Sequence, residues 1–330
     1  MNRRLMFLLL VAAGVTLFAF RSPAPLFYVP GEGWYYEPAG TNAKWTRNRA
    51  KDQLEVAEQA FTNGDYSITL RAARRVVKVW PLSDYAPRAQ FLIGRSLEAE
   101  GRDETAFNAY QTIVKNYPRS QNYENVLWQQ YEIAGRFYNG EFFRIFWGLL
   151  PLYTSMDETA KMYGKIVDSG PFSAVAPHAQ LRIGAAREKE GDYDAAVKAY
   201  EIAADRYHDQ PKIAADAMYR TAFSYNKQAT TSEYDQGTAA KAIAAYTDFM
   251  TFYPDDKRVA EAQKAVVALK AEQVRGNFNI AQYYERNRQW TGAVVYYNEV
   301  LQMDPNSPFA AQARQRIEAL KPLMLTPSAT

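Results

Sequence analysis

The sequence predicts an all-α solenoid, a stack of about six helix pairs with no β-sheet. Gly64 and Gly101 are 37 residues apart, and Pro81 and Pro118 show the same separation. A further turn at 191–193 repeats the Gly-Asp-Tyr letters of the first turn. A period in the thirties on a helical pattern is typical of stacked helix pairs. Strand-like alternation is missing from every window, so the sequence predicts no sheet.

The helix pairs follow one another along the chain. They are expected over 51–81, over 87–118, from 122 with an interruption, over 177–208, around Ala222 and Tyr246, and around Ala281 and Tyr297. The second helix of the interrupted pair is expected to begin near Met156. Glycines permit the tight turns, and each proline ends a helix because the residue before it is pushed out of helical geometry. Stacking then buries the apolar stripe that each pair exposes alone.

Composition limits the function classes. With 48% hydrophobic residues the chain has ample material for a core, and 39 basic against 36 acidic residues leave it nearly neutral. Nucleic-acid binding, which requires a strongly basic face, is therefore not expected. The chain has no cysteine. Disulfides, thiolate metal sites, cysteine nucleophiles and the acylated cysteine of a bacterial lipoprotein are thereby excluded.

Residues 1–24 are expected to be a signal peptide or an N-terminal anchor. Arg3 and Arg4 precede the uncharged run 5–20, which is shorter than the roughly 20 residues of a spanning helix. Pro25 makes the small-residue site before it a poor cleavage site. A cleaved signal, an uncleaved anchor with the body outside the cytoplasm, and a buried helix all remain open. The first two place the protein in the periplasm or at the periplasmic face of the outer membrane.

Three further boundaries follow from composition. Residues 25–44, rich in proline, glycine and aromatic residues, are expected to form an extended linker. This linker acts either as a tether or as an arm that packs on the solenoid or on a partner. The solenoid is expected over 45–320, and a flexible tail over 321–330.

The repeats resemble the tetratricopeptide repeat. That repeat has a small residue on its first helix, a glycine turn, then a small residue and an aromatic on its second helix. The fourth pair follows the pattern most closely, and its matching residues are Gly184, Gly191, Ala196, Tyr200 and Ala203. The first pair departs from it, with Thr69 where alanine is usual and Ala73 where an aromatic is usual.

A closer resemblance is to the BamD family, tetratricopeptide components of the bacterial outer-membrane protein assembly machinery. It rests on VVKVWPLSDYAPRAQFLIGRS at 76–96, IVKNYPRS at 113–120, the aromatic insertion with Phe142-Phe143, the long helical stretch after Pro254, and the last-repeat layout of 279–308. The resemblance implies a non-enzymatic scaffold whose partners are unfolded outer-membrane protein segments and the barrel-assembly protein. By the same resemblance, the N-terminal half receives the unfolded segments and residues 258–317 dock the barrel-assembly protein. The missing cysteine departs from the family, whose members are typically lipoproteins, so membrane association would come through the complex or the N-terminal helix.

Two surfaces are candidates for partner binding. First helices line the concave face of such a repeat, and on the first two pairs that face is expected to carry Leu54, Glu58, Phe61, Arg88, Phe91 and Arg95. The groove would suit an extended peptide with aromatic side chains and a terminal carboxylate. The alternative is that Phe61 and Phe91 belong to the inter-repeat core.

The second candidate surface is the apolar insertion at 141–153. Its candidate residues are Phe142, Phe143, Phe146 and Trp147. An exposed patch of this kind marks an interface with a partner or a membrane. The alternative is that the insertion folds back and fills the superhelix.

Charged residues gather in two further places. Arg71, Arg74, Arg75 and Lys78 share one helix face. The row is either a solvated convex face or a contact for acidic headgroups or an acidic partner. Glu188, Glu190, Asp192 and Asp194 surround one turn and are expected to be solvated.

Catalytic, cofactor-binding and metal-binding residues are not expected. His178 and His208 are 30 residues apart on separate helices, and the familiar catalytic motifs do not occur. Two alternatives to the assembly role remain. One is a general periplasmic tetratricopeptide adaptor, for example in cell division or polysaccharide export. The other is the helical superstructure of a glycan-cleaving enzyme.

Overall fold

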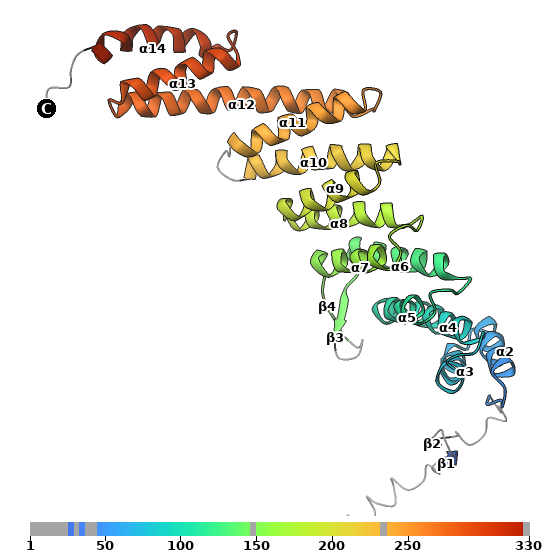
Figure 1. Ribbon diagram of the computed structural model, residues 1–330. Helices are drawn as coiled ribbons and strands as arrows, with labels where there is room; N and C mark the ends of the chain where they lie inside the picture. Colours follow the sequence, from blue (N-terminus) through green and yellow to red (C-terminus); the bar gives the residue numbers. More distant parts are fainter. Residues whose placement is uncertain (1–25, 30–32, 37–44, 146–149, 232–235, 326–330) are drawn as a thin grey trace, which may run out of the picture.

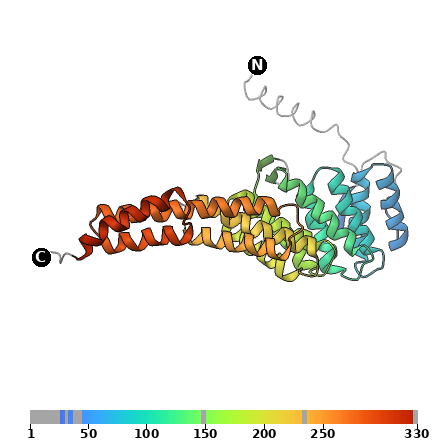
Figure 2. The same cartoon turned by 90° about the horizontal axis from the view of Figure 1, so that it is seen from above.

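The computed structural model describes residues 26–29, 33–36, 45–145, 150–231 and 236–325. Thirteen α-helices in these ranges form an elongated stack in which each helix packs on the next along the chain (Figures 1 and 2). The predicted all-α solenoid is confirmed. Across the described ranges, none of the helices combines the length and the apolar character needed to cross a membrane.

Six helix pairs and one closing helix make up the stack. The pairs are α2 (Ala50–Thr62) with α3 (Tyr66–Val79), α4 (Ala86–Ala99) with α5 (Asp103–Asn116), α6 (Tyr123–Tyr138) with α7 (Met156–Ser169), α8 (Ala176–Glu190) with α9 (Tyr193–Arg206), α10 (Pro211–Thr231) with α11 (Gln236–Phe252), and α12 (Val259–Arg286) with α13 (Trp290–Met303). These are the pairs that the sequence predicts. The closing helix α14 (Pro308–Leu325) continues through Pro322, past the predicted end of the solenoid at 320.

Two short antiparallel hairpins lie outside the helical stack. Strands β1 (Leu26–Val29) and β2 (Gly33–Tyr36) pair within the region expected to be an extended linker. Strands β3 (Phe143–Ile145) and β4 (Leu150–Tyr153) pair within the aromatic insertion between α6 and α7 (Figure 1). Aromatic residues favour strands in both segments. The expectation of no sheet therefore applies to the stack and not to these two segments.

Glycines shape the turns inside the helix pairs. Gly64, Gly101, Gly140 and Gly191 all have positive φ, between 66° and 108°. A side chain is strained in this conformation, which explains why glycine recurs at these turns. At the corresponding turn between α12 and α13 the chain uses Arg288 instead, with φ 59°.

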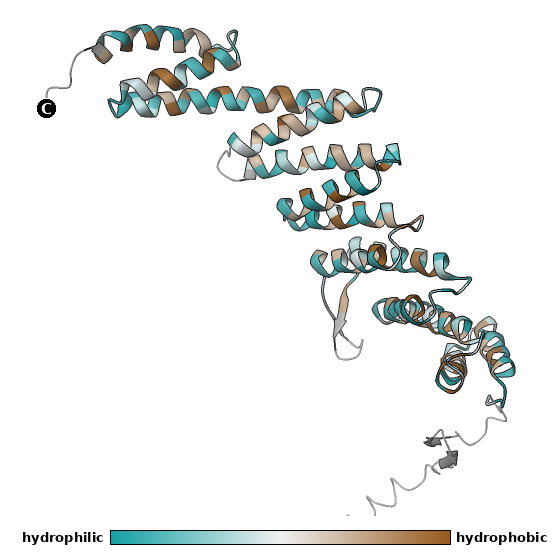
Figure 3. Ribbon diagram, viewed as in Figure 1, coloured by the Kyte–Doolittle hydropathy of each residue, from teal (hydrophilic) through white to brown (hydrophobic). Residues whose placement is uncertain are grey.

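The hydrophobic core follows the stack in successive blocks. One cluster of buried side chains spans residues 54–179, a second spans 215–269 and a third spans 274–320. Helix α12 takes part in the second and third clusters, because its two halves pack on different neighbours. Figure 3 shows that apolar and polar residues alternate along each helix of the stack.

The turns define two edges of the solenoid. The glycine edge consists of the connections inside pairs, which the structure describes at 63–65, 100–102, 139–145, 150–155, 191–192 and 287–289. The proline edge consists of the connections between pairs, at 80–85, 117–122, 170–175, 207–210, 253–258 and 304–307. In the upper part of Figure 1 the glycine edge lies on the left and the proline edge on the right. The solenoid begins at the proline edge, because first helices start there.

Candidate functional site

The predicted N-terminal groove is formed by α2 and α4, which pack on each other. Phe61 and Phe91 are partly buried and pack against the N-terminal core cluster. Leu54 was expected to line the groove but is buried, with 7% of its surface exposed. It belongs to the core because helix packing covers its side of α2. The accessible part of the predicted face therefore consists of the other five residues, Glu58, Phe61, Arg88, Phe91 and Arg95.

Arginines join the two helices across this groove. The Arg88 Nε donates to Glu58 Oε1 over 3.0 Å, and the guanidinium lies 5.9 Å from the Phe91 ring centre. The Arg95 guanidinium lies 6.0 Å from the Phe61 ring centre. Cation–π contacts of this kind hold a guanidinium in place while leaving its N–H donors available. The structure thus brings together Phe61, Arg88, Phe91 and Arg95 on one basic and aromatic face.

The aromatic insertion is partly folded back. Phe143 is buried, and its ring stacks on Phe137 of α6 with centroids 4.4 Å apart. Phe142 is 51% exposed, and Tyr153 is exposed as well. Phe146 and Trp147 lie outside the described residues. Phe143 therefore packs on the solenoid, whereas Phe142 is exposed, and a partner or membrane contact of the insertion stays a prediction.

The predicted basic row lies on α3. Arg71, Arg74 and Lys78 are exposed. Arg75 is more enclosed, with its guanidinium 5.7 Å from the Trp80 ring centre, and burial lowers its pKa. The row therefore has three solvated members and one that packs on its own helix.

A brace of one tyrosine, one glutamate and one arginine recurs three times in the stack. In each copy the tyrosine on a second helix donates its hydroxyl to a glutamate 12 residues earlier, on the first helix of the same pair. An arginine from the next first helix in the stack reaches the same glutamate. The three copies are Tyr110–Glu98–Arg136, Tyr200–Glu188–Arg220 and Tyr297–Glu285–Arg316. Each brace thus links three helices of two successive repeats.

The brace depends on close packing in the second and fourth pairs. A Cβ added at Gly94 would lie 2.4 Å from the Tyr110 ring. A Cβ added at Gly184 would lie 2.4 Å from the Tyr200 ring. Burial, followed by the nearby Glu98, raises the pKa of Tyr110, so this hydroxyl stays protonated and donates. The brace was not predicted, although the glutamate-to-tyrosine spacing of 12 residues recurs in the sequence.

Arg136 of the first brace contacts more than one carboxylate. Its guanidinium binds Asp103 through two bonds of 2.6 and 2.7 Å and Glu98 over 3.1 Å. Burial alone would lower its pKa, but the hydrogen bonds to Asp103 and Glu98 raise it. A bidentate arginine of this kind fixes orientation as well as charge. Helix α6 is thereby held against the second pair.

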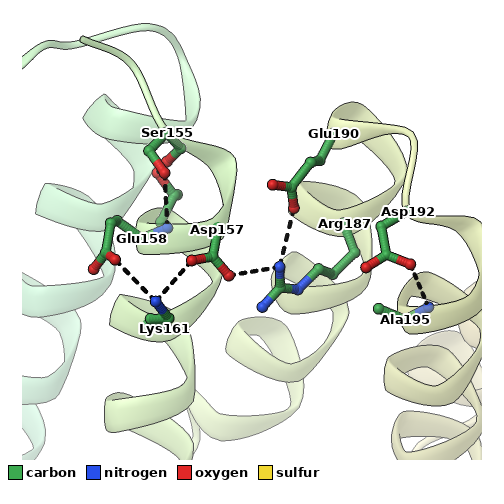
Figure 4. Close-up of polar contacts among 9 residues, drawn as sticks. Ser155, Asp157, Glu158, Lys161, Arg187, Glu190, Asp192 and Ala195 are labelled. Carbon is green, nitrogen blue, oxygen red and sulfur yellow. Dashed lines mark hydrogen bonds and ion pairs between the residues drawn. The ribbon is translucent and has the colours of Figure 1, made fainter.

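The acidic turn of the fourth pair is structural. Figure 4 shows Arg187 of α8 reaching Asp157 of α7 over 2.7 Å and Glu190 over 3.0 Å. Lys161 binds Asp157 in turn, and these cations lower the pKa of Asp157. Asp192 caps α9 by accepting from the Ala195 N–H over 3.0 Å (Figure 4).

The remaining carboxylates of this turn are engaged as well. Glu188 belongs to the brace, and Asp194 accepts from Gln228 over 2.9 Å. Together with the contacts of Glu190 and Asp192, these bonds join α7, α8, α9 and α10. Glu190, Asp192 and Asp194 are exposed, as the sequence predicts, and their bonds also fix the helices in place.

A cavity of about 780 Å³ opens at the C-terminal end, among α12, α13 and α14. Its lining combines amides, charges and apolar groups. The lining residues are Phe278, Gln282, Glu285, Arg286, Trp290, Tyr297, Gln312, Gln315, Arg316, Ala319, Leu320 and Leu323. None of these residues was predicted as a site residue, because the cavity arises from how three helices meet.

The cavity chemistry suits a peptide. Side-chain amides of Gln282, Gln312 and Gln315 can both donate to and accept from a peptide backbone. Trp290 and Leu323 offer apolar contact beside them. Volumes of this size are typical of ligand sites. For the described residues, His and acidic side chains form no cluster of three that could hold a metal ion.

Comparison with known proteins bears on two parts of the chain. Residues 154–303 match the family model YfiO, described as an outer membrane lipoprotein. Residues 88–120 match a tetratricopeptide repeat model. The first match runs from the start of α7 to the end of α13 and covers somewhat less than half of the chain. The chain is therefore a tetratricopeptide-repeat solenoid similar to that lipoprotein family in its C-terminal half.

Solved tetratricopeptide-repeat structures are similar to the chain at low sequence identity. A tetratricopeptide-repeat protein from Cytophaga hutchinsonii is 17% identical, with a TM-score of 0.37 over 81% of this chain and 88% of that one. One from Parabacteroides merdae is 10% identical, with a TM-score of 0.33 over 82% and 98%. No curated protein matches.

Proposed function

We propose that this protein is a non-enzymatic scaffold of the bacterial envelope, a BamD-like component of outer-membrane protein assembly. The observation that carries the proposal is the match of α7 to α13 to an outer membrane lipoprotein family, on a solenoid of tetratricopeptide repeats. The N-terminal basic and uncharged segments support export to the periplasm or to the periplasmic face of the outer membrane.

The N-terminal groove is proposed to receive unfolded outer-membrane protein segments. Arg95, close to Phe61, and the terminal amino groups of Arg88, whose Nε is already bonded to Glu58, would bind carboxylates. Aromatic side chains of an extended segment would pack on the two phenylalanines. The exposed Phe142 on the insertion would add a second apolar contact.

The C-terminal cavity is proposed to dock the barrel-assembly protein. It lies within α12 to α14, and the lipoprotein match extends through the first two of these helices. Its glutamines would bind the backbone of a partner segment, and Trp290 would contact an apolar side chain. The third brace keeps the three helices of the cavity in fixed relation during binding.

Affinity purification from detergent-solubilised envelope of the host tests this proposal. We expect the full chain to recover the barrel-assembly protein. Exchanging two cavity amides for carboxylates, Gln312→Glu with Gln315→Glu, should lower the recovery about tenfold because acceptor-only groups cannot donate to a backbone carbonyl. Gln302→Glu, at an exposed glutamine of α13 outside the cavity, is the matched control. Full-chain preparations without any barrel-assembly protein would overturn the assembly role.

One observation favours a second candidate, a general periplasmic adaptor in cell division or polysaccharide export. The chain has no cysteine to acylate, unlike a typical lipoprotein. In that case the same purification recovers a different envelope protein, and the cavity variant loses it.

A further inference from the structure

Two large apolar side chains project fully into solvent from matching turns of the proline edge. Leu82 is 98% exposed and Phe172 is 99% exposed. Each directly follows the proline of its turn, Pro81 or Pro171. The turn between them carries Arg119 at the same position, after Pro118, and this arginine is exposed too. Three successive turns thus present leucine, arginine and phenylalanine at one edge.

The surroundings of Leu82 and Phe172 combine apolar, aromatic and charged side chains, and exposed Asp84 and Asp168 lie among the basic ones. Val79 and Tyr85 are exposed beside Leu82. Lys78 and Lys115 are exposed near the ends of the helices that lead into the first two turns. Apolar tips among basic side chains are typical of surfaces that enter the headgroup region of a membrane.

The glycine edge provides the contrast. Its turns at 63–65, 100–102 and 191–192 consist of Asn-Gly-Asp, Glu-Gly-Arg and Gly-Asp. In the described part of the chain, that edge exposes Phe142 and Tyr153 of the hairpin insertion, and Tyr283, Leu323 and Met324 are exposed near the ends of α12 and α14. What distinguishes Leu82 and Phe172 is that no other large apolar side chain of the described residues is exposed to the same extent.

The chain also enters the solenoid at the proline edge. Helix α2 starts there at Ala50, after residues 1–44. Residues 21–44 separate the uncharged run 5–20 from the described solenoid and span at most about 80 Å when extended. An apolar segment held in a bilayer would therefore connect to the solenoid at this edge, within about 80 Å of the lipid.

Leu82 and Phe172 lie on separate turns, and this separation favours a lipid surface over a protein partner. Protein interfaces concentrate their binding energy in one packed, desolvated centre. Here the apolar residues stand singly on successive turns with a basic residue between them. Each tip can enter a bilayer without a shaped pocket opposite it.

We propose that the proline edge of the first three inter-pair turns lies against an anionic lipid bilayer. Leu82 and Phe172 enter the headgroup region, and Arg119 contacts lipid phosphates. The groove and the cavity then face the aqueous side, whichever protein occupies them.

The absence of cysteine allows a direct test. Full-length Leu82→Cys and Phe172→Cys each carry one polarity-sensitive fluorophore and are reconstituted with vesicles of phosphatidylethanolamine and phosphatidylglycerol. Matched labels at Asn63→Cys and Glu190→Cys report on the glycine edge. We expect the labels at 82 and 172 to shift to shorter wavelength and to be quenched by lipid-attached nitroxides, while those at 63 and 190 stay unchanged.

A label-free variant completes the test. Leu82→Ser with Phe172→Ser should lower vesicle binding about tenfold per tip without changing the unfolding temperature, because neither side chain packs in the core. Equal responses at all four labels, or none at 82 and 172, would overturn the proposal. So would a shift that requires envelope protein in place of pure lipid, since the edge would then bind a protein partner.

Discussion

The second and the last helix pairs carry the same brace in different surroundings. In the second pair the Tyr110 ring lies against Gly94, inside a core that extends from residue 54 to 179. In the last pair Tyr297 is equally buried, but Ala281 occupies the place of the glycine and the brace borders the C-terminal cavity. One local contact thus serves a continuous core in one region and frames an open hollow in the other.

This comparison distinguishes the regular repeats, where the brace lies inside the stack, from the last repeat, where it lies at an open surface. Regular repeats bury their first helices between neighbours, whereas the last first helix, α14, has a described neighbour on one side only. The brace compensates by fixing Glu285 between Tyr297 and Arg316. The third brace therefore holds α12, α13 and α14 together beside a surface that another helix would cover in a longer stack.

Removing the two tyrosines should give the largest effects. Tyr110→Ala and Tyr297→Ala each delete a fully buried ring and should cost about 3–5 kcal/mol. The core clusters are separate, so Tyr297→Ala should raise amide hydrogen exchange in α12 to α14 while α4 to α9 stay protected. Tyr110→Ala should show the reverse pattern. Uniform loss of protection in either variant would mean that the stack unfolds as one unit.

Adding a methyl group at the glycines tests the close approach. Gly94→Ala and Gly184→Ala each place a Cβ against a tyrosine ring and should destabilise the protein by about 1–3 kcal/mol. The matched change in the last pair, Ala281→Gly, should cost only about 1 kcal/mol through helix propensity. Thermal unfolding of the three variants provides the comparison. A neutral Gly94→Ala would show that the ring can move aside.

The middle of the stack offers a pH test. Hydrogen bonding by Arg258 lowers the pKa of Asp256 from 3.8 to about 2. A depressed carboxyl pKa stabilises the fold above the unfolded pKa, and this contribution is lost as the pH falls from about 4 to about 2. Near solvent the contribution is about 1 kcal/mol. Asp256→Asn should therefore lower the unfolding temperature at neutral pH and have little effect at about pH 2, and an equal loss at both would contradict this linkage.

The turns should give the smallest effects, of opposite sign. Arg288→Gly relieves a positive φ and should stabilise the C-terminal block by about 0.5–1 kcal/mol. Gly191→Ala introduces the same strain into a regular turn and should destabilise it by about 1 kcal/mol. Thermal unfolding measures both, and equal signs would contradict the assignment of strain.

The sequence predicted the helix pairs because glycine and proline mark turns through backbone geometry, which is local. It also placed Phe61, Arg88, Phe91 and Arg95 on one face through helical periodicity. Leu54 was misplaced because the border between groove and core depends on where α4 packs.

The brace and the cavity could not be predicted from the sequence, for related reasons. The spacing from glutamate to tyrosine is constant, but the arginine follows its glutamate by 38, 32 or 31 residues. The three arginines therefore align only in space. The cavity likewise depends on how three helices meet at an end of the stack, and no local pattern encodes that.

Site-specific photo-crosslinking in the host tests the central claim, that the C-terminal cavity binds a protein of the outer-membrane assembly machinery. A benzophenone amino acid replaces Gln312 in the cavity or Val295, an exposed residue of α13 outside it. We predict a crosslink to the barrel-assembly protein from position 312 and none from position 295. Equal crosslinking from both positions, or none from the cavity, would contradict the account.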